Sequence, residues 1–339
     1  MKIPLYIPEP LAGVDLASWF APKWEGALFR TIGWPVFFDE DVERVPVEQA
    51  KGILLQNNFR LMSLESEAYI AKYADLGVKH GIPVYIFSFG DFTDELHFDP
   101  RVHIFRLSVY STELHPHDIV TPTFTEDHGR ESVVIRKKQA KPIVSFCGMG
   151  GFPSWKGWVK YYIKNFLWDV RAFFNPRARA KKIGVYWRRA MMHACEQSPL
   201  VDTNFIVRRS FSGLKRTIEV DPQIARKEYL DSITESDFVL APKGDGNYSN
   251  RFLKTLSLGR IPVLVDTDVV LPLEDVIDYS KIVVRVPMKD VHNTPKYIRE
   301  FYDKLSESDW QDRQRMARKA FEEYLRQDSF FRYFFTHSA

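Results

Sequence analysis

Short apolar runs alternate with amphipathic stretches along most of the chain, which predicts strands that alternate with helices. In the first half we expect a helix at residues 64–77 and strands at residues 52–55, 83–87, 102–106 and 142–146. The second half repeats the plan, with strands expected at residues 204–207, 238–241, 261–265 and 282–284. Strands that alternate with helices form parallel sheets with helices on both faces. The predicted fold class is therefore α/β.

The clearest unit spans residues 236–272, where a strand, a glycine-containing loop, a short helix and a second strand follow one another. Ser249 is placed to cap this helix, and Gly259 is placed to end it in the left-handed conformation. Gly244 and Gly246 lack Cβ atoms, so a ligand can approach the loop backbone closely. The helix N-terminus behind the loop carries partial positive charge. This unit predicts an anion site.

Two full charges lie beside the same loop. Lys243 precedes it and Arg251 lies in the first turn of the helix. A guanidinium can bind two phosphate oxygens at once, which makes a diphosphate the expected ligand. The alternative is structural, because any α/β protein needs such turns and glycines commonly follow strands.

Composition narrows the class of protein. At 339 residues, with 45% hydrophobic and 27% charged residues, the chain fits two soluble domains. A net charge of +3 is too small to imply nucleic acid. The two cysteines, Cys147 and Cys195, give neither a disulfide framework nor a metal cluster, which suits a reducing cytosol. Neither a signal peptide nor a membrane-spanning segment is evident, so we expect a cytoplasmic protein.

The basic and aromatic segment at residues 155–182 marks the expected domain boundary. We divide the chain into domains at residues 1–170 and 171–305, followed by a C-terminal helix at residues 306–339. At helical spacing the segment carries an aromatic stripe, formed by Trp155, Trp158, Tyr162 and Phe166. The favoured interpretation is a helix buried on one side. The alternative is a helix that lies on an anionic membrane, which would place the protein on the inner face of the membrane.

Residues 306–339 are predicted to be helical. Ser308 is the expected N-cap, and aromatic side chains then follow in quick succession, at Phe330, Phe331, Tyr333, Phe334 and Phe335. An ending this aromatic predicts a docked rather than a frayed terminus.

Several motifs resemble the exostosin family of glycosyltransferases, in particular its compact bacterial-type members. The central matches lie at residues 243–249, 251–252, 255–257, 259–263 and 271–273. Further matches lie at residues 141–148, 203–208 and 310–331, so that the resemblance spans residues 106–331. It implies a GT-B type fold of two Rossmann-like domains facing each other across a cleft, with the last helix crossing back to the first domain. It also implies sugar transfer from a nucleotide-sugar to an acceptor hydroxyl, with inversion, without a bound metal and without another cofactor.

The resemblance assigns donor-binding roles to Arg208, Lys243, Gly244, Gly246, Asn247, Tyr248, Ser249, Arg251 and Lys254. Tyr248 could stack on the base or simply pack against its neighbours. Lys254 is a departure, since the family pattern usually has a glutamate there, and an ammonium cannot accept hydrogen bonds from a ribose. We expect Lys254 to face water, in preference to pairing with an acid or contacting a phosphate.

A catalytic base is expected on a loop near the cleft, since inverting transfer must remove the proton of the attacking hydroxyl. Asp127, with Glu126 beside it, is the first candidate, because similar proteins carry a recurrent acidic residue in this region. Asp91 and His97, which follow an expected strand, compete with it.

The sequence therefore predicts a transferase that builds a surface glycan from a nucleotide-sugar, with a glycan or lipid-linked acceptor. One alternative is a non-catalytic sugar-nucleotide or glycan-binding module of the same fold, which the lysine at position 254 would permit. Another is a protein that binds a membrane surface or nucleic acid through residues 155–182. The low net charge argues against nucleic acid.

Overall fold

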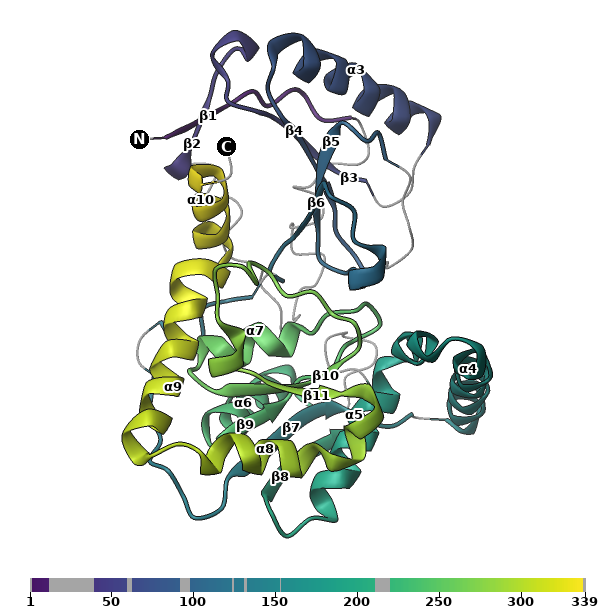
Figure 1. Ribbon diagram of the computed structural model, residues 1–339, viewed down its shortest axis with the longest axis vertical. Coiled ribbons are helices and arrows are strands. Elements are labelled where there is room, and N and C mark those ends of the chain that lie inside the picture. The colour runs from purple at the N-terminus through teal and green to yellow at the C-terminus, as the bar shows by residue number, and fades with distance from the viewer. Residues whose placement is uncertain are drawn as a thin grey trace.

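Two parallel sheets form the framework of the protein and lie one above the other in Figure 1. The computed structural model describes residues 2–11, 40–59, 63–91, 98–123, 125–130, 133–152, 154–210 and 220–337. Every strand of both sheets pairs in parallel with its neighbours, and helices pack on the sheet faces. The prediction of two Rossmann-like α/β domains is confirmed.

The first sheet has the strand order β3-β4-β5-β6. Its strands are β3 (Ile53–Asn58), β4 (Val84–Ser88), β5 (Val102–Arg106) and β6 (Asp118–Val120). A smaller parallel pair, β1 (Ile3–Leu5) and β2 (Val42–Arg44), lies beside it. The helix α3 (Leu64–His80) begins at Ser63, whose hydroxyl accepts a hydrogen bond from the Ser66 amide.

Alternate residues along the strands of this sheet pack against two different helices, one on each face. Ile53, Leu55 and Val84 pack in one cluster with the buried side of α3. Leu54, Tyr85, Phe87 and Phe105 point to the other face, as successive strand residues must, and pack against α10 (Gln327–His337). The final helix therefore covers the first domain. The last helix was expected to cross back to this domain.

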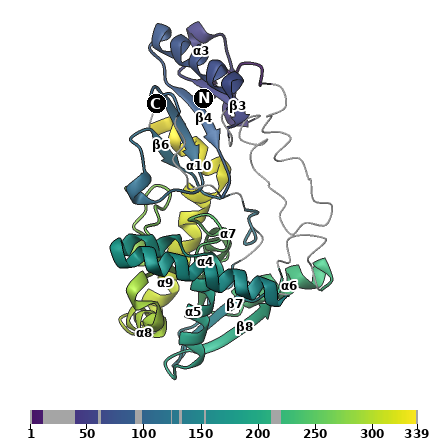
Figure 2. The same ribbon diagram turned by 90° about the vertical axis from the view of Figure 1, so that its right-hand side faces the viewer.

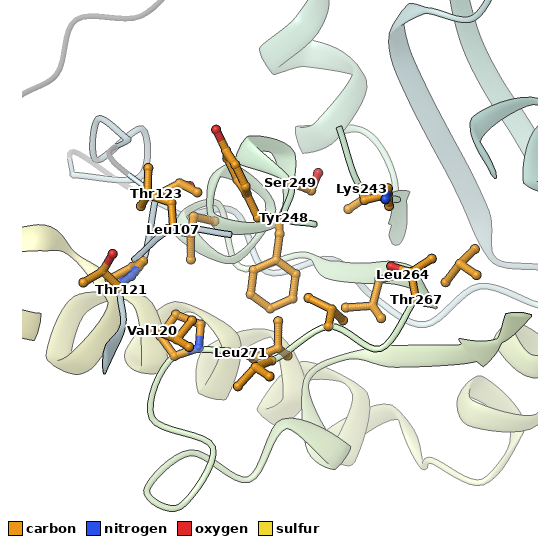
Figure 3. A pocket seen from close by; sticks show the side chains of 18 residues that line it. Leu107, Val120, Thr121, Thr123, Lys243, Tyr248, Ser249, Leu264, Thr267 and Leu271 are labelled. Carbon is orange, nitrogen blue, oxygen red and sulfur yellow. The ribbon is translucent and has the colours of Figure 1, made fainter. Parts of the chain in front are cut away.

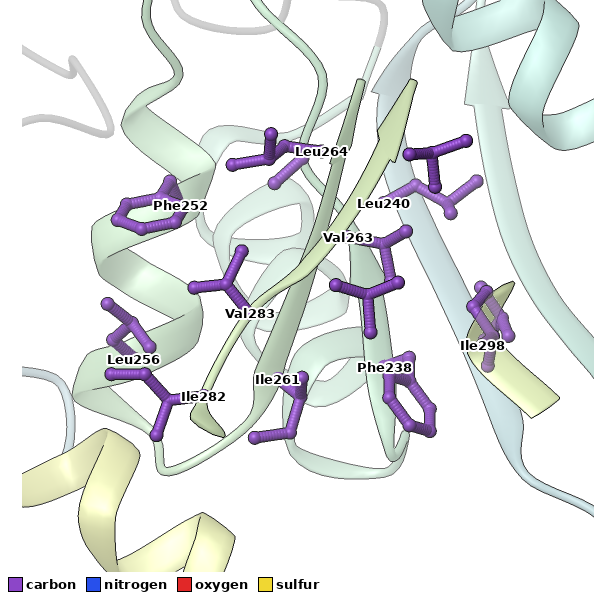
Figure 4. Packing of buried hydrophobic residues seen from close by; sticks show 14 of the residues in the cluster. Phe238, Leu240, Phe252, Leu256, Ile261, Val263, Leu264, Ile282, Val283 and Ile298 are labelled. Atoms are coloured by element: carbon purple, nitrogen blue, oxygen red, sulfur yellow. The ribbon is translucent and has the colours of Figure 1, made fainter. Parts of the chain in front are cut away.

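The second sheet has the order β11-β10-β9-β7-β8. Its strands are β7 (Ile143–Met149), β8 (Asp202–Arg208), β9 (Phe238–Leu240), β10 (Ile261–Asp266) and β11 (Val284–Pro287). Two helices pack on one face, α5 (Gly184–Glu196) and α8 (Thr294–Asp303). The opposite side is covered by α6 (Pro222–Thr234), α7 (Asn250–Ser257) and α9 (Glu307–Ala320). Figure 4 shows the apolar core between the strands and α7.

The position of β7 corrects the expected division of the chain. We expected this strand to be the last of the first half, but it pairs with both β8 and β9 in the second sheet. A strand buried on both faces has the same apolar pattern in either sheet, so its sequence cannot show which sheet it joins. We therefore propose that the boundary lies between β6 and β7 and not near residue 170.

The tail helix also starts earlier than expected. Ser306, not Ser308, is the N-cap of α9, and it forms a capping box with Asp309. A π-helical turn (Phe321–Leu325) then connects α9 to α10.

The helix α4 (Trp155–Phe174) stands beside the second domain in Figure 1 and lies in front of it in Figure 2. Only Tyr161 and Asn165 are buried in it. The expectation that its aromatic stripe is buried is wrong, because the exposed fractions of Trp155 and Phe166 are 70% and 65%. Across the described parts of the chain, no helix is long and apolar enough to cross a membrane.

Candidate functional site

A cavity of about 450 Å³ opens at the carboxyl ends of β7 and β9. The chain passes from β7 outward to β8, and then returns to the other side of β7 to form β9. The strand order thus reverses between β7 and β9, and ligands of open α/β sheets bind at this switch point. Five basic side chains line the cavity, namely Arg188, Arg208, Arg226, Arg251 and Lys254.

Arg251 joins the ends of the two strands at the switch point. Its Nη2 donates to the Cys147 carbonyl of β7 at 2.7 Å, and its Nη1 donates to the Leu240 carbonyl of β9 at 3.2 Å. The guanidinium lies over the Phe146 ring, 4.0 Å from its centroid. Its Nε is buried and has no hydrogen-bond partner in the described residues. The sheet thus holds a cation in a fixed position at the cavity wall.

The N-terminus of α7 lies at the same wall, because Ser249, Asn250 and Arg251 all line the cavity. The expected capping by Ser249 is wrong, since its side chain makes no cap hydrogen bond. The first turn of the helix therefore turns an uncapped positive end toward the cavity, which favours an anion. The expected end of the helix is confirmed, because Gly259 has a φ of 65°.

Arg188 is a site residue that the sequence analysis missed. It lies on α5, lines the cavity and donates from Nη1 to the Met149 carbonyl at 3.2 Å. Burial, with the charge of Arg251 nearby, lowers its pKa to about 10, so it stays charged at neutral pH. The sequence shows only a glycine, Gly184, one turn earlier, and the structure gives the reason for it: a Cβ there would lie 2.5 Å from the Gly244 carbonyl oxygen. This close contact holds α5 against the loop.

The expectation that Lys254 faces water is wrong, because the side chain is buried. Its exposed fraction is 4%, and its Nζ lies over the Tyr229 ring, 5.1 Å from the centroid. Burial, with the charge of Arg226 nearby, lowers its pKa to about 7, against the opposing effect of Glu126. The short helix α7 has no solvent-exposed side for this residue, because every position from Phe252 onward is buried.

Arg208 and Arg226 line the cavity with acidic partners. Arg208, at the end of β8, forms an ion pair with Glu228. Arg226, on α6, forms an ion pair with Glu126. Arg188 and Arg251 differ from them, because both donate to backbone carbonyls.

Lys243, one of the expected phosphate ligands, points away from the cavity. Its Nζ donates to the Tyr110 hydroxyl at 2.8 Å and to the Ala180 carbonyl at 3.0 Å. Burial lowers its pKa to about 8, against the opposing charge of Asp245. The structure therefore uses Lys243 to hold the loop against the first domain and against the segment after α4.

Gly246 and Asn247 also contact the first domain. A Cβ on Gly246 would lie 2.9 Å from the Ser108 Oγ and 3.0 Å from the Asp91 Cα, so only glycine fits there. The Asn247 amide donates to the Ser108 Oγ at 2.8 Å, and its side chain donates to the Val109 carbonyl at 3.1 Å. These two residues join the two domains. Neither of them lines the cavity, whereas Gly244, the other glycine of the loop, does.

Tyr248 lies between the cavity and a small apolar pocket of about 40 Å³ on the other side of the loop. Figure 3 shows this pocket, which Leu107 of the first domain and Leu271 also line. Its volume has room for roughly three water molecules, so it cannot take a nucleobase. Tyr248 packs partly against the apolar core of the first domain.

The acidic candidates fall in different places. Asp127 does not line the cavity: its carboxylate binds the Arg318 guanidinium through both oxygens, with one distance of 3.0 Å. Glu126 is held by Arg226 beside the cavity. Asp91, from the loop after β4, lines the cavity. His97 lies outside the described residues.

His128 also lines the cavity but is not a strong base. Burial, with the charge of Lys254 nearby, lowers its pKa to about 4. The ring is therefore neutral at physiological pH, with little affinity for a second proton.

Comparison with known proteins finds a family model that matches part of the second domain. Residues 173–301 match the family model described as Exostosin GT47 domain. The Exostosin-1 homolog of Caenorhabditis elegans is 31% identical over 105 residues, which are 30% of this chain. The match spans about a quarter of that relative's length. The resemblance seen in the sequence is therefore confirmed.

Solved structures also align with the chain. A glycosyltransferase from Rickettsia africae ESF-5 aligns over 100% of both chains, with a TM-score of 0.37 and 9% identity. An alpha-glucosyltransferase solved with UDP-glucose and DNA containing an abasic site aligns over 99% of this chain and 98% of its own, with a TM-score of 0.39 and 12% identity.

Proposed function

We propose that this chain, whose residues 173–301 carry an exostosin GT47 domain, is a glycosyltransferase that moves a sugar from a nucleotide-sugar to an acceptor hydroxyl. The observation that carries the proposal is Arg251, which bridges the carboxyl ends of β7 and β9 beside the uncapped N-terminus of α7. A fixed guanidinium and a helix N-terminus together fit a diphosphate.

The charge balance of the cavity supports a diphosphate leaving group. When the acceptor oxygen attacks the anomeric carbon, the bond from that carbon to the diphosphate breaks and negative charge develops on the departing oxygen. Arg188, Arg251 and Lys254 line the cavity where this charge would develop. Positive groups that are already in place stabilise such charge at little cost in reorganisation. We propose inversion without a bound metal, with these cations stabilising the leaving group.

Asp91 is the carboxylate that we propose as the base. It lines the cavity and belongs to the first domain, whereas the proposed diphosphate-binding side chains belong to the second domain. An acceptor bound between the domains could give its hydroxyl proton to Asp91 while its oxygen attacks the sugar. The acceptor is proposed to be a glycan or a lipid-linked glycan.

Nucleoside diphosphates and nucleotide-sugars are expected to raise the thermal unfolding midpoint of the purified chain, and Arg251→Ala is expected to abolish most of that rise. Loss of one charge-assisted hydrogen bond of about 1.5–3 kcal/mol weakens binding roughly 10- to 150-fold. Arg315→Ala is the matched control, because Arg315 is an exposed arginine on α9 outside the cavity.

An equal response of Arg251→Ala and wild type would show that the phosphate site lies elsewhere. Stabilisation by a nucleotide-sugar without slow hydrolysis of that donor would favour the non-catalytic binding module over the transferase.

Nucleoside diphosphate binding is expected to weaken between pH 6 and pH 8, as Lys254 loses its proton. The pKa of Lys254 in the free protein is about 7, so its charge is present below this pH and lost above it. Titration calorimetry at several pH values should show that the affinity falls as the pH rises, and that this fall is smaller in Lys254→Met. The phosphate groups titrate identically with both proteins, so the difference between the two slopes reports Lys254.

As the pH rises, the free energy of unfolding should increase, whereas the affinity for a nucleoside diphosphate should decrease. The lowered pKa means that the folded state carries a buried charge below about pH 7, and that the unfolded chain holds this proton up to about pH 10.5. This residue's contribution to stability therefore rises with pH from about 7 to 10.5. In the absence of ligand, Lys254→Met should be more stable than wild type at pH 6.

A further inference from the structure

We propose that α4 docks on the surface of an anionic lipid bilayer through its exposed apolar side. Nine large apolar side chains of this single helix are exposed, namely Trp155, Val159, Tyr162, Ile163, Phe166, Leu167, Val170, Phe173 and Phe174. Isolated exposed apolar residues are normal on a protein surface, but a contiguous set marks an interaction site.

The helix has three sides with different chemistry. Its inner side holds the buried Tyr161 and Asn165 and the partly buried Trp158 and Trp168. At about 100° per residue, the nine exposed apolar side chains occupy an arc of roughly 140° on the outer side. Lys160, Lys164 and Arg171 follow at one edge of this arc, and Lys156 lies within the arc near the same edge. An apolar arc bordered by cations is the arrangement of a helix that lies in a membrane interface.

The charges around α4 select an anionic surface. The helix contains one acid, Asp169, and its carboxylate is paired with Lys182 at 2.7 Å. The short helix that follows (Pro176–Lys181) adds Arg177 and Arg179, both exposed. Lipid bilayers with anionic headgroups offer both an apolar interior and negative charge, whereas a second copy of this basic face would repel it.

The place of α4 in the fold gives docking a role in the proposed transfer, on which this part of the inference rests. α4 follows directly after β7, whose end residues Cys147 and Met149 line the cavity. Trp158 of α4 packs under Arg189, 4.6 Å from the ring centroid to the guanidinium carbon, next to the cavity residue Arg188. A membrane bound at α4 would therefore hold a lipid-linked acceptor close to the donor.

The test is co-sedimentation of the full chain with vesicles of phosphatidylcholine, with and without phosphatidylglycerol. We expect binding to the anionic vesicles that weakens as salt is added, and little binding to neutral ones. Lys160→Glu with Lys164→Glu should reduce binding at least about 30-fold, since each basic residue contributes ~1 kcal/mol, or roughly fivefold. Phe166→Ser with Phe173→Ser should reduce it about tenfold per side chain, from roughly 1.5 kcal/mol each.

The matched control is Lys296→Glu with Lys304→Glu, which makes the same change in net charge on exposed lysines of α8 and its end. This control should bind as wild type does. If wild type ignores anionic vesicles, or if the control loses as much binding as the α4 variant, the membrane proposal is wrong. A dimer in solution that Phe166→Ser with Phe173→Ser dissociates, with no vesicle binding, would show that a second copy covers this surface.

The two proposals fail separately. Nucleotide stabilisation without vesicle binding would overturn only the membrane surface. Vesicle binding without nucleotide stabilisation would leave α4 as a membrane-binding helix and overturn the donor site. The α4 variants should keep the nucleotide response of wild type, because their side chains do not line the cavity.

Discussion

Asp91→Asn is expected to lower turnover by about 10²- to 10⁴-fold, the usual contribution of a general base, while nucleotide binding stays close to that of wild type. Asparagine keeps the size of the side chain but cannot accept the proton of the attacking hydroxyl. Asp91 lines the cavity from the first domain, whereas the side chains proposed to bind the diphosphate come from the second. Slow hydrolysis of the preferred nucleotide-sugar provides the measurement, with water in place of the acceptor.

Asp127→Asn is the matched comparison. Asp127 binds Arg318 outside the cavity, so this variant should lower the unfolding midpoint and leave hydrolysis per folded molecule largely intact. The opposite pattern, with full hydrolysis in Asp91→Asn and loss in Asp127→Asn, would restore Asp127 as the base.

Phe331→Ala is expected to reduce the free energy of unfolding by about 3–5 kcal/mol, the range for a buried phenylalanine. Phe331 lies in α10 with an exposed fraction of 1%. Its ring stands edge-on to Phe105, 5.2 Å between centroids, and packs on Phe87 at 6.3 Å. Its removal leaves a cavity where the last helix meets the first sheet. Urea unfolding should show a lower midpoint with little change in slope.

Phe174→Ala provides the control for this substitution. Phe174 ends α4 with an exposed fraction of 83%, so the same change there should move the free energy of unfolding by less than about 0.5 kcal/mol. A small effect of Phe331→Ala, comparable to that of Phe174→Ala, would mean that α10 does not stabilise the first domain.

Local structure followed closely from the sequence. The short helix expected within residues 236–272 is α7 (Asn250–Ser257), and the strand expected at residues 102–106 is β5 (Val102–Arg106). Strands and short helices of this kind depend on apolar period and on turn residues, both of which are visible in a short window of sequence.

The roles of the loop residues did not follow, because they depend on contacts between distant parts of the chain. Lys243 and Asn247 have the composition of a phosphate loop, yet they bind Tyr110, Ser108 and Val109 of the first domain. Which side of a loop faces a ligand and which faces another domain is decided by tertiary packing.

The same limit explains the burial of Lys254. A charged residue on a short helix is expected to face water, and here α9 and the π-helical turn cover the remaining side of α7. Arg188 was missed for a related reason. Its role depends on how closely α5 approaches the loop, which only the backbone contact at Gly184 reveals.

The return of the chain to the first sheet limits how the domains can move. The polypeptide crosses between the sheets once between β6 and β7 and again where the π-helical turn joins α9 to α10. Two such tethers resist twisting and sliding but permit rotation about the line that joins them. The cavity is therefore expected to open by a rotation of one domain about the axis through these two connections. A more rigid π-helical turn is expected to slow the release of a bound nucleotide without contacting it.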